Sequence, residues 1–65
     1  MQRTFQFVIT WAEASKKVRE IREMGIPYEI DSTSNGMVVI YMPDLLLRVY
    51  NSVRAIFNDN GLRGL

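Results

Sequence analysis

The chain has 65 residues, of which 48% are hydrophobic and 23% charged, and its formal net charge is +1. This length accommodates one domain, residues 1–65, and the near-neutral charge excludes a polycation that would bind nucleic acid electrostatically. The absence of Cys and His excludes disulfides, thiolate nucleophiles, the commonest zinc ligands and the usual acid–base group of neutral-pH catalysis.

A strand is predicted in RTFQFVIT, residues 3–10, because its side chains alternate with the period of a half-buried strand. One side is apolar: Phe5, Phe7 and Ile9. The other side carries Thr4, Gln6 and Val8.

A helix is predicted to begin at about Trp11, because TWAE, residues 10–13, is a capping box. In such a box the Thr10 hydroxyl accepts from the Glu13 amide, and the Glu13 carboxylate reaches back. The helix has one inward stripe: Trp11, Ala14, Val18 and Ile21. Three i,i+4 charge pairs indicate that the remaining surface is a solvated face: Glu13 with Lys17, Lys16 with Glu20, and Arg19 with Glu23.

Gly25 is expected to end this helix in the left-handed conformation, with Ile26 contacting Ile21 in a Schellman motif. A second strand follows Pro27, and its inner and outer residues alternate. The inner residues are Ile26, Tyr28 and Ile30, and the acidic outer side carries Glu29 and Asp31. Asn35 and Gly36 then predict a tight turn with positive backbone φ angles.

Residues 37–42 are apolar at every position, which is typical of a central strand. Pro43 and Asp44 are expected to open a second helix. Its broad apolar face consists of Leu46, Val49, Tyr50, Val53, Ile56 and Phe57. Gly61 and Leu62 are expected to repeat the Schellman pattern against Phe57.

The expected fold is therefore an α+β domain of order β-α-β-β-α, in which a three-stranded sheet of order 1-3-2 packs two helices on one face. This plan resembles the ferredoxin-like, split β-α-β fold with its last strand missing. Residues 58–65 leave open whether a short fourth strand is present.

Three families on this plan can be compared motif by motif. The chain resembles RNA-recognition domains in topology, but those stack bases on several aromatic side chains, and here the open face is expected to carry only Tyr41. Acylphosphatases share the architecture, yet ITWAEAS, residues 9–15, lacks their glycine-rich anion loop and arginine. Small bacterial signal-transducing domains are similar in their succession of strand, helix, GIP (residues 25–27) and hairpin. No functional residue is carried over from these families.

The chemistry-bearing residues predict neither a catalytic site nor a cofactor. Glu29 and Asp31, with Asp44 or Asp59, could supply oxygen ligands to a hard cation, but no calcium-loop spacing is present. Charges that protect a sheet edge from aggregation are the better interpretation of this pair. We therefore expect no enzyme activity, no bound metal, no small-molecule substrate and no nucleic-acid ligand.

A partner surface is predicted on the face of the sheet opposite the helices. There four residues are expected to form a contiguous apolar patch: Val8, Met37, Val39 and Tyr41. Trp11, in the first helical turn, either caps one end of the core or presents an aromatic anchor to a partner. A homodimer or a protein partner is expected on these grounds, through the patch or through the unpaired edge of the first strand.

Two origins fit this sequence. The capping box, paired surface charges, Schellman ends and Asn-Gly turn resemble computational design, so an engineered, independently folding scaffold without evolved function is the first hypothesis. The alternative is a natural bacterial or phage protein-interaction or regulatory module. No apolar run approaches the roughly 20 residues of a membrane span, so we expect a soluble protein, cytoplasmic if it is natural.

Overall fold

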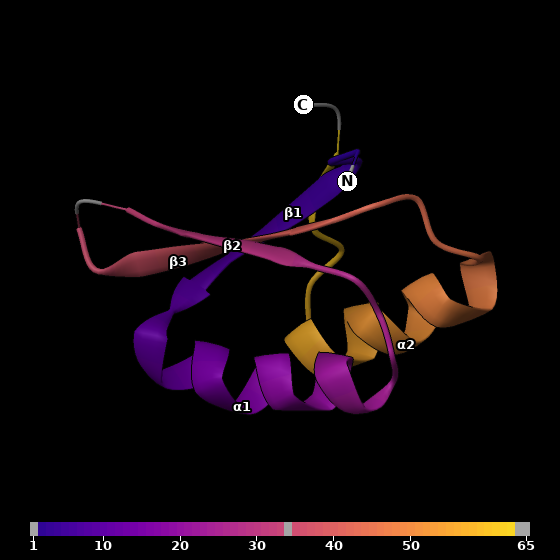
Figure 1. The fold of residues 1–65 in the computed structure, drawn as a ribbon, viewed down its shortest axis with the longest axis horizontal. Coiled ribbons are helices and arrows are strands. Elements are labelled where there is room, and N and C mark those ends of the chain that lie inside the picture. Colours follow the sequence, from indigo (N-terminus) through magenta and orange to yellow (C-terminus); the bar gives the residue numbers. More distant parts are fainter. Residues whose placement is uncertain (1, 34, 64–65) are drawn as a thin grey trace.

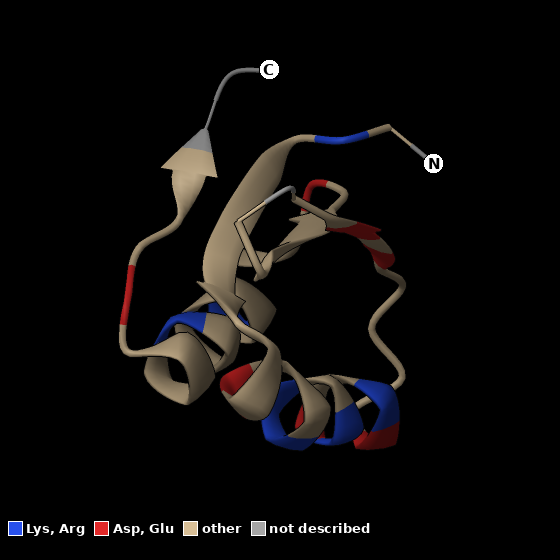
Figure 2. Ribbon diagram, turned by 90° about the vertical axis from the view of Figure 1, so that its left-hand side faces the viewer, with Lys and Arg blue, Asp and Glu red and all other residues tan. Residues whose placement is uncertain are grey.

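Two helices lie against one face of an antiparallel sheet (Figure 1). The computed structural model describes residues 2–33 and 35–63. Its elements, in chain order, are β1 (Phe5–Thr10), α1 (Trp11–Glu23), β2 (Glu29–Ser32), β3 (Met37–Met42), α2 (Leu47–Phe57) and β4 (Leu62–Arg63). Figure 2 shows the two layers from the side, with α1 below the β2 side of the sheet and α2 below the β1 side.

The strand order is β2-β3-β1-β4, so the predicted order 1-3-2 is confirmed. β3 pairs with both β1 and β2, with Val8 opposite Val39 and Ile30 opposite Ile40. The open question about the C-terminal residues is answered by β4, a two-residue strand whose Leu62 pairs with Gln6. The first strand was expected to leave its outer edge unpaired. This expectation is wrong at the N-terminal end of β1, where Phe5 and Gln6 pair with β4. Among the described strands, β2 forms the other edge of the sheet.

The core lies between the sheet and the helices, and aromatic rings connect β1 to α2. The rings of Phe7 and Phe57 are stacked, with centroids 4.1 Å apart. The rings of Phe5 and Tyr50 meet edge to face at 5.3 Å. Every second residue of β1, beginning with Phe5, is buried, as its period-two pattern predicts.

Both ends of α1 follow the local signals of the sequence. The Glu13 amide donates to Thr10 Oγ1 over 3.3 Å, and the helix begins at Trp11. At its end Gly25 has a φ of 73°, and the Ile26 amide donates to the Ile21 carbonyl over 3.2 Å. This is the predicted Schellman motif.

The predicted charge pairs on α1 are not found among the described residues. Lys17 Nζ donates instead to the main-chain carbonyl of Ile56 over 2.8 Å, which connects α1 to α2. A lysine in this position satisfies a carbonyl in the last turn of α2, where the helix dipole favours a cation. The tertiary contact therefore replaces the local pair that spacing alone suggested.

The turn between β2 and β3 differs from the predicted one. Gly36 has the predicted positive φ, 80°. The Thr33 amide donates to the Met37 carbonyl over 2.9 Å, and the Met37 amide donates to Thr33 Oγ1 over 3.2 Å. The loop is therefore closed by Thr33 and Met37, outside the two-residue turn predicted at Asn35 and Gly36.

α2 begins and ends at residues other than those predicted. Leu46 is its N-cap and Leu47 its first residue, while Leu45 is partly buried against the core. The helix ends at Asn58, whose φ of 53° is left-handed, and the Asp59 amide then donates to the Arg54 carbonyl. The Schellman end predicted at Gly61 is therefore wrong.

Among the described residues, no helix has the length and apolar character needed to cross a membrane.

Candidate functional site

The four outer-face residues predicted as a partner patch lie on neighbouring strands. Val8 of β1 is opposite Val39 of β3, while Met37 and Tyr41 lie two positions to either side of Val39. All four belong to the side of the sheet that faces away from the helices, because they alternate with core residues. The sequence therefore grouped these residues correctly, although whether they bind a partner stays a prediction.

The exposure of these four residues differs from the prediction, and Arg3 covers Tyr41 on this face. The Arg3 guanidinium lies 3.9 Å from the centroid of the Tyr41 ring, and its Nε donates to Glu29 Oε1 over 2.9 Å. A second guanidinium nitrogen is 3.6 Å from Asp31 Oδ2. Val39 keeps only 9% of its surface exposed, whereas Val8 keeps 41%. The outer face of the sheet is thus not a continuous apolar patch, because the charged Arg3 side chain lies across part of it.

The hydrogen bond to Glu29 raises the pKa of Arg3, and the negative charges of Glu29 and Asp31 act in the same direction while desolvation opposes them. A cation whose pKa is raised on folding loses its contribution to stability only when the pH rises through that pKa. Since the ordinary pKa of arginine already lies far above neutrality, the Arg3 guanidinium stays charged throughout the physiological pH range.

A second surface lies between α1 and β2 and was only partly anticipated. It is a groove of about 270 Å³. Its lining comes from α1, β2 and β3: Trp11, Ala14, Ser15, Val18, Arg19, Arg22, Ile30 and Val38. The side chain of Trp11 is 56% exposed at this groove, so it does not cap the core. Ile30 is 40% exposed although Ile40, which lies opposite it on β3, is a core residue.

The groove is apolar at one end and cationic at the other. Trp11 lies at the start of α1, and Arg19 and Arg22 follow two and three turns later along the same side of the helix. Arg22 Nη2 donates to the Tyr28 hydroxyl over 2.9 Å, which positions the guanidinium beside the chain segment that enters β2. None of the glutamates of α1 lines the groove.

The backbone of β2 adds hydrogen-bonding groups along the groove. In an antiparallel ladder the amides point alternately toward the neighbouring strand and away from it. Because the Thr33 amide bonds to Met37, those of Asp31 and Glu29 also point toward β3. The amides and carbonyls of Ile30 and Ser32 therefore point away from the sheet, at its open edge.

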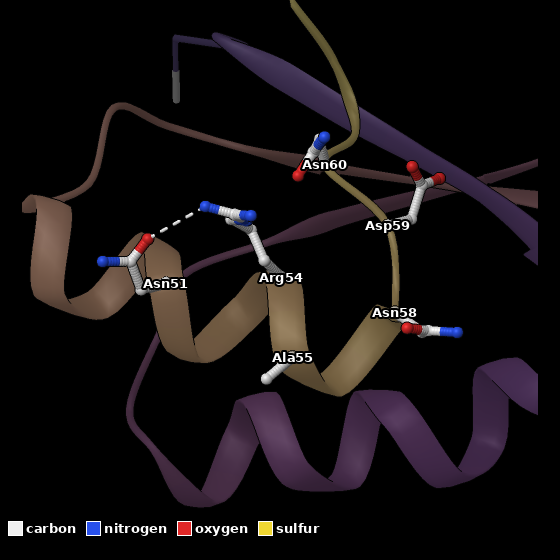
Figure 3. Close-up of a pocket in the computed structure, with 6 residues that line it drawn as sticks. All are labelled: Asn51, Arg54, Ala55, Asn58, Asp59 and Asn60. Carbon is white, nitrogen blue, oxygen red and sulfur yellow. Dashed lines mark hydrogen bonds between the residues drawn. The ribbon is translucent and has the colours of Figure 1, made fainter.

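A third surface is the open polar hollow of about 720 Å³ shown in Figure 3, formed by α2 and the loop after it. Its residues are Asn51, Arg54, Ala55, Asn58, Asp59 and Asn60. Arg54 donates to Asn51 over 3.3 Å, and Asp59 accepts from the Gly61 amide. These groups hold the end of α2, and the helix carbonyl end beside them disfavours an anion. The hollow therefore has a structural explanation.

The possible cation ligands are not assembled into a site. Among residues 2–33 and 35–63, no group of three or more carboxylate, thiol or imidazole side chains is close enough to hold a metal ion. Glu29 and Asp31 contact Arg3 instead.

Sequence reasoning identified Trp11 but missed Ile30, Arg19 and Arg22 as parts of one groove. The available signal was the spacing of Trp11, Ser15, Arg19 and Arg22, which places uncharged and basic residues without an acid on one side of a helix. No protein-family model matches the chain, and comparisons with curated proteins and with solved structures give no significant match.

Proposed function

We propose that this protein is a non-catalytic protein-binding domain that holds a segment of its partner in the groove between α1 and β2. The observation that carries the proposal is that two large apolar side chains, Trp11 and Ile30, are both exposed and line the same groove. Exposed tryptophan in a concave apolar site is typical of an interaction hot spot. An isolated domain gains nothing from leaving such surface in water.

The size of the groove favours side chains over a small molecule. Its volume of about 270 Å³ is below the roughly 300–1,000 Å³ of pockets that enclose drug-sized ligands. Its chemistry favours binding over catalysis. The one hydroxyl in the lining, that of Ser15, donates to the Ala12 carbonyl over 3.3 Å, and the charged residues there are arginines, which cannot act as a base.

The fold itself supports an interaction module over a designed scaffold. The N-cap of α2 is Leu46, which forms no side-chain hydrogen bond and is 71% exposed. Designed helices are normally given a polar N-cap, and their surfaces avoid exposed leucine. We also infer that the architecture is a split β-α-β, ferredoxin-like plan with β4 as a very short last strand, because the strand order and the two helices on one face are those of that plan.

Selection from a random peptide library displayed on phage tests the proposal. Peptides enriched on the wild-type protein are expected to bind Trp11→Ala at least about tenfold more weakly, since truncating a hot-spot tryptophan commonly has an effect of this size. Val8→Ser is the matched control, because Val8 is similarly exposed but lies on the other face of the sheet. Peptides that bind wild type and Trp11→Ala equally would refute the proposal.

A further inference from the structure

We propose that the bound segment is an extended peptide that adds to the sheet as a strand beside β2, with an apolar side chain against Trp11 and Ile30 and an acidic side chain against Arg19 and Arg22. This inference rests on the proposed function and specifies the conformation and the chemistry of its ligand. Three observations support it: the open backbone edge, the direction of the Ile30 side chain and the distribution of charge along the groove.

The backbone edge of β2 supplies the first argument. Ile30 and Ser32 each direct an amide and a carbonyl away from β3, as the register of the hairpin requires. An extended peptide can pair with these four groups in the way that one strand pairs with the next. A helix lying in the groove would leave them to water, so the edge favours a strand.

The side-chain direction supplies the second argument. Ile30 points toward the helix side of the sheet, because it lies opposite the core residue Ile40. A peptide residue paired with Ile30 would direct its own side chain to the same side of the sheet. It would therefore enter the groove beside Trp11 and Val18. The peptide residue two positions further toward Tyr28 would reach the cationic end.

Charge supplies the third argument and identifies the ligand. Arg19 and Arg22 present two positive charges with no acidic residue in the lining, so an acidic side chain at that end of the peptide is favoured. A second copy of this chain is a poor occupant. Two β2 strands paired about a two-fold axis run antiparallel, so on the groove side the second copy would present Ile30 and Ser32, neither of which is an acid that could meet the arginines.

Synthetic peptides of about seven residues provide the test. On the side that faces the groove each peptide carries Leu and, two positions later, Glu, and on the opposite side it carries uncharged polar residues. Binding is measured by titration calorimetry, which does not depend on the Trp11 side chain and therefore also applies to Trp11→Ala. Methylating the peptide amide that pairs with Ile30 removes one main-chain hydrogen bond while keeping every side chain, and we expect it to weaken binding about tenfold. Exchange of the Ile30 and Ser32 amides with solvent should slow when the unmodified peptide is bound.

A charge reversal tests the acidic position. We expect Arg19→Glu combined with Arg22→Glu to bind the Glu peptide about tenfold or more weakly, and to bind a matched Lys peptide better than the wild-type protein does. Both arginines are exposed, so the variant should fold, and far-ultraviolet circular dichroism checks that it does.

The outcomes separate the two proposals. Equal affinity of the methylated peptide, or unchanged exchange at Ile30 and Ser32 when peptide is bound, overturns strand addition but leaves the groove as a binding site if Trp11→Ala still weakens binding. Equal binding to Trp11→Ala overturns the groove itself. Protection of the two amides in the free protein at high concentration would show that a second copy occupies the edge, and it would also overturn the inference.

Discussion

Gly61 directly precedes β4, and both its backbone conformation and its close contact with β1 favour glycine. Its φ is 80°, and a β-carbon there would lie 3.0 Å from two atoms of the Phe7 ring and 3.2 Å from the Gln6 carbonyl oxygen. We expect Gly61→Ala to lower the free energy of unfolding by about 1–3 kcal/mol, since the backbone strain and the contact add. Urea titration measures the loss.

Gly25 is the matched control, because its φ of 73° is similar but a β-carbon there would meet no atom within 4 Å. We expect Gly25→Ala to cost about 1 kcal/mol, the penalty of the left-handed conformation alone. An equal loss in the two variants would show that the contact with Phe7 does not contribute. An unchanged midpoint for Gly25→Ala would remove Gly25 as the stop of α1.

Among single residues, the sequence correctly predicted Gly25 as the end of α1 but wrongly predicted Gly61 as the end of α2. Gly25 is the one residue near the end of α1 that readily adopts a positive φ, and Ile26 completes the motif. Near the end of α2 both Asn58 and Gly61 tolerate a positive φ, and both adopt one. The apolar residue after Gly61 suggested that the glycine ends the helix, whereas the close approach to Phe7 requires that glycine for another purpose.

The edge strand β2 leads to a prediction at the scale of the element. Hydrogen exchange monitored by nuclear magnetic resonance should show fast exchange for the amides of Ile30 and Ser32 in the free protein, because they point away from β3. The amides of Glu29 and Asp31 should exchange more slowly. The same protection at all four positions would mean that the pairing differs from the one described.

A better N-cap at the start of α2 should make the protein more stable. Leu46 has a φ of −57° and a ψ of 145°, the extended conformation that an N-cap residue needs, but its side chain cannot accept a hydrogen bond. Leu46→Asp should raise the free energy of unfolding by about 0.5–2 kcal/mol. Leu46→Ala removes the same exposed side chain without supplying an acceptor, so a similar stability of the Asp and Ala variants would contradict the capping argument.

The elements that the sequence predicted well are those with local signals. β1 has a clear alternation, α1 has signals at both ends, and β3 is apolar throughout. The start of α2 was predicted too early because Pro43 and Asp44 are helix-opening residues, whereas Leu45 packs against the core and the helix begins only at Leu47. The groove could not be predicted as a unit. Trp11 and Ile30 come from different elements, and only the packing of α1 under β2 brings them into one site.

At the scale of the whole molecule, the outer face of the sheet is the surface through which we expect weak self-association at high concentration. Val8 is exposed there, while the edge of β1 is paired with β4 at Phe5 and Gln6. Sedimentation equilibrium should detect a dimer, and Val8→Lys should abolish it, because a lysine ammonium cannot be buried there unpaired. A strict monomer at every concentration, or a dimer unaffected by Val8→Lys, would contradict the prediction.

Val8 is a better probe of this surface than Val39. Val39 is 9% exposed within one molecule, so Val39→Lys would lower the stability of the monomer as well as that of any dimer. Val8→Lys changes a side chain that is already 41% exposed. Comparing the urea midpoints of the two variants would separate loss of folding from loss of association.

The central position of β1 has a consequence for how the molecule is made. Both strands that flank β1, β3 and β4, follow it in the chain, and Phe5 pairs with Met42 at the far end of β3. During synthesis on the ribosome, β1 is therefore made before either partner strand, and its apolar Phe5, Phe7 and Ile9 stay unpaired until β3 and β4 can dock. The helices and the hairpin of β2 and β3 can form from local contacts within microseconds, whereas closing β1 between its partners requires the distant pairing that slows folding. We expect the nascent β1 segment to be the part of this protein that a chaperone binds first.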